Sequence, residues 1–130
     1  VQLDRVIALE EMTLKVATRR HQDPLNPLRN EDGELPITAG IEIAGEAMAL
    51  HGALTLNSTD AGPRPGMLAQ ARDLQWSHER LDDDPDEIEI TVTLIARTED
   101  SAMYHFEMAS PTRPDLMTGR LTVFFPGAPS

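Results

Sequence analysis

The sequence contains no cysteine, and this absence removes several kinds of chemistry at once. Without thiols the chain has no disulfide framework, no thiolate zinc site and no cysteine nucleophile. Histidine is the remaining nitrogen ligand, and its four copies lack the spacing of a metal site: His21, His51, His78 and His105. We therefore expect no metal and no cofactor, and we expect a cytoplasmic location.

Basic residues are also scarce, with 11 Lys+Arg against 22 Asp+Glu and a formal net charge of -11. Nucleic acid is excluded as a partner because its phosphates need a basic surface. No apolar run approaches the roughly 20 residues that cross a bilayer. The 130 residues fit a single domain. Because no leader precedes Val1, we expect the native protein to begin upstream of it.

Most of the chain alternates apolar and polar side chains, which is the period of a half-buried antiparallel strand. In residues 87–97 one face collects Ile88, Ile90, Val92, Leu94 and Ala96. Residues 102–108 follow after a short link, which predicts a hairpin with the preceding strand. The other predicted strands are residues 2–11, 12–20, 66–81 and 119–125. The acidic run 82–87 is interpreted as a solvated loop.

One segment differs, because residues 39–56 are apolar on nearly all sides and free of proline. Such a segment is typical of a buried helix. Gly45, Ala49 and Gly52 lie at helical spacing and predict a strip where a strand backbone approaches closely. The order of two strands, one helix and four strands predicts an α+β fold, in which a bent antiparallel sheet wraps around the helix.

Two glutamates interrupt this apolar helix, and a buried carboxylate is costly without a partner or a task. Helical geometry places Glu42 and Glu46 roughly 40° apart, which makes them candidates for one shared site. Alternatively, they mark a helix edge that reaches solvent or a dimer seam. His51 is roughly 180° from Glu42, so it is a poor catalytic partner within one chain.

Residues 35–54, LPITAGIEIAGEAMALHGAL, resemble the central-helix motif of the hotdog-fold 3-hydroxyacyl-ACP dehydratases. They are most similar to divergent relatives encoded in aryl polyene pigment clusters. The matching positions are Leu35, Pro36, Gly40, Ile41, Glu42, Ala47 and His51. Further similarities follow in the family's order at residues 3–10, 64–76 and 119–127. The resemblance implies one hotdog domain, residues 1–130, that works as a dimer.

In that family a loop histidine removes the proton alpha to the carbonyl of a 3-hydroxyacyl thioester, and a helix carboxylate protonates the departing hydroxyl. The two groups come from opposite subunits, and backbone N–H groups at the helix start polarise the thioester oxygen. By position, the resemblance implies Glu42 as the acid and Gly40 and Ile41 as substrate-binding residues. Glu46 is a further candidate for the acid.

The family's His-Phe-Pro-Gly loop has no counterpart here, because the segment before the helix reads NPLRNEDGELP and no histidine occurs from Gln22 to Met48. His21 lies just upstream, either as a candidate base or as an ordinary turn histidine. His51 is the other catalytic candidate. The expected substrate is an acyl thioester of acyl carrier protein or coenzyme A, with no nucleic acid or membrane partner.

Three functions stay open. The chain is a dehydratase-like subunit whose histidine is supplied by a paralogous hotdog subunit, a non-catalytic subunit that stabilises such a partner, or an acyl thioesterase in which Glu42 orients water. Acyl carrier proteins are acidic, so docking one requires a local basic cluster. The residues available for it are Arg19, Arg20, Arg64 and Arg72.

Overall fold

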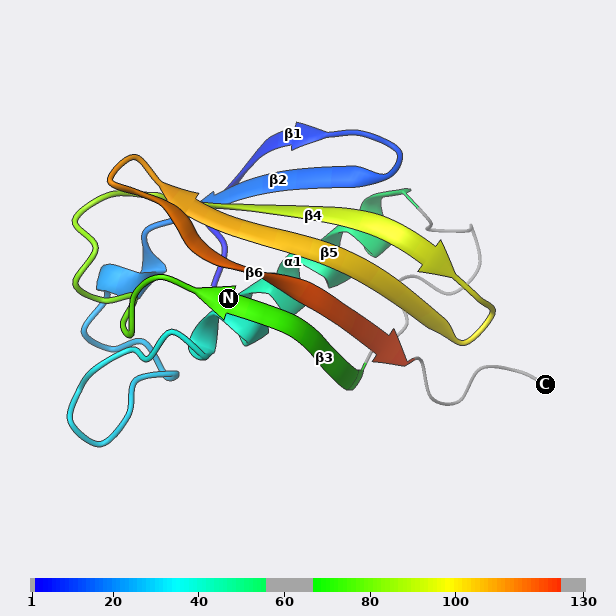
Figure 1. The fold of residues 1–130 in the computed structure, drawn as a ribbon. Helices are drawn as coiled ribbons and strands as arrows, with labels where there is room; N and C mark the ends of the chain where they lie inside the picture. The colour runs from blue at the N-terminus through cyan, green and yellow to red at the C-terminus, as the bar shows by residue number, and fades with distance from the viewer. Residues whose placement is uncertain (1, 56–66, 125–130) are drawn as a thin grey trace.

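Six strands and one long helix follow one another along the residues described by the computed structural model, 2–55 and 67–124. Their order is the predicted one, and Figure 1 shows their arrangement. The elements are β1 (Arg5–Leu9), β2 (Thr13–Thr18), the short 3-10 helix η1 (Arg20–Gln22), α1 (Ala39–Thr55), β3 (Met67–Trp76), β4 (Ile88–Arg97), β5 (Ser101–Ser110) and β6 (Arg113–Phe124).

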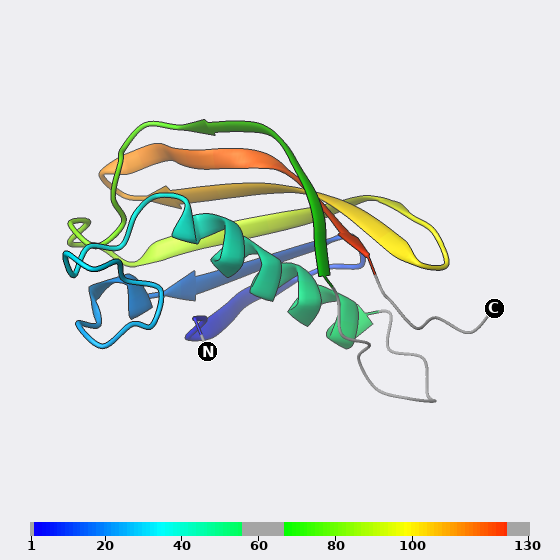
Figure 2. The same ribbon diagram turned by 90° about the horizontal axis from the view of Figure 1, so that it is seen from below.

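The strands form one antiparallel sheet in the order β1-β2-β4-β5-β6-β3. The predicted hairpin is confirmed, because β4 pairs with β5 from Glu89 opposite Ala109 to Arg97 opposite Ala102. The sheet curves around α1, which lies on its concave side (Figure 2). The predicted α+β fold, a bent sheet around one helix, is therefore confirmed. The strands β1 and β3 stand at its two edges.

The predicted alternation in β4 holds from Ile88 to Leu94. Every second residue is buried, and the residues between them, Glu89, Thr91 and Thr93, are half-buried. Ala96 is exposed, because the pairing of β4 with β5 shifts register between Leu94 and Ala96. This shift moves the end of the strand out of the alternating pattern.

The helix is buried on one side only, which corrects the expectation of a helix buried all round. The side that faces the sheet is covered by β2, β4 and β5. Its buried residues are Ala39, Gly40, Ile43, Ala44, Ala47, Met48 and His51. Glu42, Ala49 and Leu54 are exposed on the other side. The physical reason is that a single sheet layer covers a single face of a helix.

The predicted close approach at Gly45, Ala49 and Gly52 is wrong, because added β-carbons at Gly45 and Gly52 would meet nothing within 4 Å. The close approach occurs at Gly40 instead. A β-carbon there would lie 3.0 Å from the Sδ atoms of both Met108 and Met117. Glycine at this position therefore lets the start of α1 pack directly against β5 and β6.

The acidic run 82–87 is a loop, but the prediction that it is solvated is wrong for two of its residues. Asp84 is buried, and its Oδ2 accepts a 2.6 Å hydrogen bond from the hydroxyl of Ser110. The side chain of Asp82 is only 7% exposed. Both carboxylates lie inside because hydrogen-bond donors meet them there.

The predicted strand 66–81 ends earlier, at Trp76, and Arg80 instead forms an isolated bridge with Pro36. Across the described ranges, no helix is long and apolar enough to cross a membrane. No group of three metal-binding side chains occurs in the same ranges. Several predicted features lie outside the described residues: Leu56 in the helix, residues 57–66 with Arg64, and the end of the chain from residue 125.

Candidate active site

Glu42 lies in the first turn of α1 and is exposed. No described residue forms a hydrogen bond or ion pair with its carboxylate. Glu42 is therefore a free carboxylate, held by a rigid helix on the side that the sheet leaves uncovered.

Glu46 lies one turn further along the same side, but it already has a partner. Its Oε1 accepts a 3.0 Å hydrogen bond from the backbone N–H of Gln2. Beside it, α1 and β1 border an open groove of about 580 Å³. The apolar residues that line this groove are Leu3, Val6, Val16, Ala49, Leu50 and Ala53. Glu46 thus ties the N-terminal segment to α1, and a site shared by Glu42 and Glu46 stays a prediction.

The backbone N–H groups of Gly40 and Ile41 close tight turns at the start of α1. Gly40 donates to the carbonyl of Ile37 at 2.9 Å, and Ile41 donates to the carbonyl of Thr38 at 3.1 Å. A thioester oxygen that binds these groups would therefore have to share or replace those bonds. The substrate-binding role of Gly40 and Ile41 stays a prediction with this condition attached.

His51 lies on the opposite side of α1 from Glu42, facing the sheet, and is completely buried. Its Nε2 is 2.9 Å from the carbonyl oxygen of Glu11, and its Nδ1 is 2.7 Å from the hydroxyl of Tyr104. Because a carbonyl only accepts, Nε2 carries the hydrogen and Nδ1 accepts from the tyrosine. Burial raises the pKa of Tyr104 to about 12, so its hydroxyl keeps its proton. Both nitrogens of His51 are occupied, which agrees with a structural histidine.

His21 is also completely buried, although it lies in the short helix η1 after β2. The sequence left a candidate base and an ordinary turn histidine open; the residue does lie in a turn, and its role stays a prediction. The Nε2 of His21 is 3.1 Å from the carbonyl oxygen of Asp84. Its Nδ1 has no hydrogen-bond partner among the described residues. The carbonyl of Asp84 belongs to the acidic loop, where the side chain of this residue is buried and bonded to Ser110.

The protonation state of His21 follows from these contacts. Burial lowers the pKa of the ring below 6.5 and outweighs the backbone of Asp84, which favours the charged form. In the neutral ring, Nε2 carries the hydrogen that is donated to the carbonyl, so Nδ1 holds a free lone pair. That is the form of a base, but the ring is closed off from solvent.

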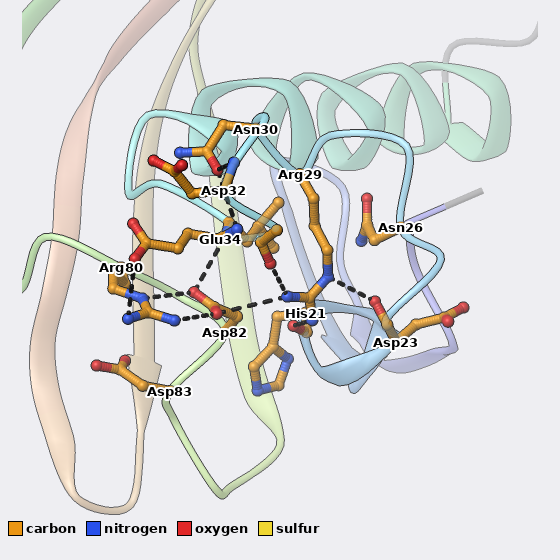
Figure 3. Close-up of polar contacts among 12 residues, drawn as sticks. His21, Asp23, Asn26, Arg29, Asn30, Asp32, Glu34, Arg80, Asp82 and Asp83 are labelled. Carbon is orange, nitrogen blue, oxygen red and sulfur yellow. Dashed lines mark hydrogen bonds and ion pairs between the residues drawn. The ribbon is translucent and has the colours of Figure 1, made fainter.

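A cluster of polar contacts surrounds the segment between η1 and α1 (Figure 3). We call it the loop cluster and define it as the side chains of Arg29, Arg80 and Asp82 together with the backbone groups that they bind, which belong to His21, Asp23, Gly33 and Leu35. The guanidinium of Arg29 donates to the backbone carbonyls of His21 at 3.1 Å, Asp23 at 2.8 Å and Gly33 at 2.5 Å. It also lies 3.4 Å from Oδ2 of Asp82.

Asp82 is the second centre of the loop cluster. Its Oδ1 accepts a 3.0 Å bond from the backbone N–H of Leu35, and Arg80 forms a forked ion pair with both of its oxygens. Hydrogen bonding from Arg80 lowers the pKa of Asp82 to about 2. Sequence reasoning missed both Arg29 and Asp82. The acidic run was the available signal, but its spacing does not reveal which carboxylates turn inward.

The comparison with solved structures identifies the fold. The chain aligns with the dehydratase heterocomplex ApeI:P from Xenorhabdus doucetiae at a TM-score of 0.77 and 23% identity, covering 98% of this chain and 84% of that one. A mutant thioesterase from Staphylococcus aureus aligns at 0.64 and 14% identity, covering 92% and 89%. A Streptococcus mutans protein bound to acetyl CoA aligns at 0.64 and 10% identity, covering 97% and 90%.

This chain is accordingly a hotdog-fold protein. The family model of ApeP-like proteins, described as ApeP dehydratase, matches residues 1–130, and the chain therefore belongs to the ApeP-like dehydratase family. No curated protein matches the sequence. The resemblance expected from residues 35–54 is confirmed.

Proposed function

We propose that this chain is one subunit of a two-subunit dehydratase that acts on 3-hydroxyacyl thioesters, with Glu42 as the acid. The observation that carries the proposal is the position of Glu42, a carboxylate without a partner on the uncovered side of α1. Membership of the ApeP-like dehydratase family supports the reaction class. The structures of a heterocomplex and of a protein bound to acetyl CoA share the fold and support the assembly and the thioester.

The reaction needs two proton transfers. A base removes the proton from the carbon alpha to the thioester carbonyl, and the electron pair of that C–H bond forms the new double bond. The C–O bond at the beta carbon breaks, and the hydroxyl leaves as water with the proton donated by Glu42. An acid must be neutral at the start of the reaction. Covering Glu42 with a second subunit would remove it from water and favour that neutral form.

The outer edge of β3 supports a second subunit. This strand pairs with β6 on one side only, because it stands at the end of the sheet. Its exposed apolar residues are Met67 at 61%, Leu68 at 51% and Trp76 at 45%. An unpaired edge that carries large apolar side chains is a surface for strand pairing with another chain. We propose that a hotdog subunit, a second copy or a histidine-bearing paralogue, joins the molecule here.

The source of the base distinguishes these two assemblies. His51 is fully bonded in the core, so it stays outside the proposed site. The Nδ1 of His21 has no described partner, but the residue is completely buried, so a substrate reaches it only if the surrounding structure moves. The proposal therefore takes the histidine from the partner subunit. An active homodimer would instead assign the base to His21.

The direct test is an assay of the purified chain on a 3-hydroxyacyl thioester, alone and mixed with a histidine-bearing hotdog partner. We expect formation of the unsaturated thioester only in the mixture. Activity of the chain alone would contradict a base from the partner and would assign the base to His21 instead. Hydrolysis without dehydration would identify a thioesterase, and no reaction in either sample would leave a stabilising subunit.

The thioester carrier is a further part of the proposal. Acyl carrier protein and coenzyme A are both compatible with the expected substrate. Arg20 forms an ion pair with Asp4 at 3.0 Å, while Arg19 and Arg72 are exposed. Together with Arg20, which is also exposed, these two arginines are the described cations of the proposed carrier cluster. We also keep the cytoplasmic location within this proposal.

A further inference from the structure

The segment between η1 and α1 has little regular structure of its own. From residue 23 to residue 38 it contains turns and a single bridge residue, and no strand or α-helix. Backbone hydrogen bonds close its separate turns, such as the 2.9 Å bond from the N–H of Gly33 to the carbonyl of Asn30, and side-chain contacts connect these turns to one another. The same segment separates His21 from the helix that carries Glu42.

Arg29 connects the start of this segment to its middle. Its guanidinium binds the carbonyls of His21 and Asp23 at the start and the carbonyl of Gly33 in the middle. Its side chain is only 15% exposed. A planar guanidinium presents five donors in a fixed fork, so one side chain can hold several carbonyls at defined angles.

Asp82 continues this connection to the start of α1. Its Oδ1 accepts from the N–H of Leu35, four residues before the helix begins. The carbonyl of Leu35 then accepts from Leu81 at 2.8 Å, and the N–H of Ile37 donates to Glu79 at 2.9 Å. The acidic loop and the entry to the helix are thereby joined side by side.

We infer that Arg29 and Asp82 are positioning residues that fix the segment 23–38, and with it the start of the helix that bears Glu42, the proposed acid. This inference rests on the proposed function for its kinetic consequence. The positioning role itself is inferred from the contacts of the two side chains, independently of the reaction. Neither residue touches substrate in this account, and both act through the backbone of the segment that they hold.

The first test compares two arginine variants in whichever sample catalyses dehydration, the chain alone or its mixture with a histidine-bearing partner. Arg29→Gln removes the fork, and we expect kcat to fall by about 10- to 100-fold with little change in KM, because small displacements of catalytic groups are costly. Arg29→Lys should recover only part of the rate, since one ammonium cannot hold four acceptors. Arg5→Gln is the matched control, because Arg5 forms an exposed ion pair with Glu87 at 2.6 Å.

The second test needs no activity. The ring of His21 is titrated by NMR in the wild type and in the same variants. The charged groups that act on this ring are the carboxylate of Asp84 and the guanidinium of Arg19. If Arg29 holds the segment closed, Arg29→Gln should let water reach the ring and raise the pKa of His21 toward 6.5. Arg5→Gln should leave this titration unchanged.

The outcomes separate the inference from the proposed function. A wild-type preparation that never dehydrates contradicts the proposed function, while the titration of His21 still tests the positioning role. If Arg29→Gln lowers stability but matches Arg5→Gln in both kcat and titration, the positioning role is wrong. Should Arg29→Gln fail to fold, Asp82→Asn and Arg29→Lys are measured in the same two ways.

Discussion

Two buried histidines of this chain differ in how they are bonded. His51 and His21 are both completely inaccessible to solvent. His51 donates to Glu11 and accepts from Tyr104, so both of its nitrogens are paired. His21 is bonded only to the carbonyl of Asp84, and its Nδ1 has no described partner. Two equally buried histidines therefore differ in how fully their ring nitrogens are paired.

The difference follows from where each residue lies. His51 is held between a long helix and the centre of the sheet, where Tyr104 packs edge-on against it at 5.5 Å between ring centroids. His21 lies in the short helix η1, where its ring is bonded to the backbone carbonyl of Asp84 in the acidic loop. In a regular core an unpaired polar group costs stability, which accounts for the full pairing of His51.

The largest expected effect is on stability at His51. Replacement by leucine would leave the hydroxyl of Tyr104 and the carbonyl of Glu11 without their partner, and we expect a loss of about 3 kcal/mol. His21→Leu removes a single bond, and the carbonyl of Asp84 keeps a 3.2 Å bond from Gln22. We expect that variant to lose about 1 kcal/mol or less.

Urea unfolding of the two leucine variants measures this difference directly. The m-values should match the wild type, so that a shift in midpoint reports stability alone. Equal losses at the two positions would mean that pairing does not distinguish the two histidines.

A smaller effect is expected when His51 is made to resemble His21. Tyr104→Phe keeps the ring but removes the hydroxyl that donates to Nδ1 of His51. The nitrogen then has no partner, and we expect a loss of about 1–2 kcal/mol by the same unfolding measurement. An unchanged midpoint would show that an unpaired imidazole nitrogen is tolerated in this core.

The dependence of stability on pH should come from His21 in the mildly acidic range. Burial lowers the pKa of His21 below 6.5, so the unfolded chain binds a proton more readily than the folded one. Stability from the neutral ring is complete above pH 6.5 and is lost as the pH falls through this value toward the pKa of the folded state. His21→Leu should therefore flatten the decline just below pH 6.5, and an unchanged slope would contradict this assignment.

The smallest effect on stability is expected at Glu42. Its carboxylate is exposed and has no described partner, so Glu42→Gln should change the free energy of unfolding by less than about 0.5 kcal/mol. Thermal unfolding is sufficient to measure this. A larger loss would indicate that the carboxylate has a structural role in the subunit.

The sequence predicted the fold well because the signals for it are local and repeated. The alternation over residues 88–94 indicates a strand with one buried face, and the structure has that strand. The apolar stretch at residues 39–55 indicates a helix, and the structure has that helix. What could not be predicted was which sides of the helix are covered. A buried helix and a helix with one uncovered face have similar composition when the uncovered face carries alanine, as at Ala49.

The site was predictable only in part. Glu42 was found because a glutamate in an apolar helix is conspicuous and matches the family motif. Arg29 and Asp82 were missed, because they meet through an irregular segment that has no period. Contacts between residues 29 and 82 are set by tertiary structure, and no local pattern reports them.

The central claim is that this chain supplies a carboxylate to a site completed by a second subunit. Its most direct test is the rate of dehydration in the active mixture with Glu42→Gln, alongside Glu46→Gln, which keeps an acceptor for the N–H of Gln2. The account predicts that Glu42→Gln abolishes turnover while Glu46→Gln retains it, with both variants as stable as the wild type. Unchanged turnover in folded Glu42→Gln would contradict the account.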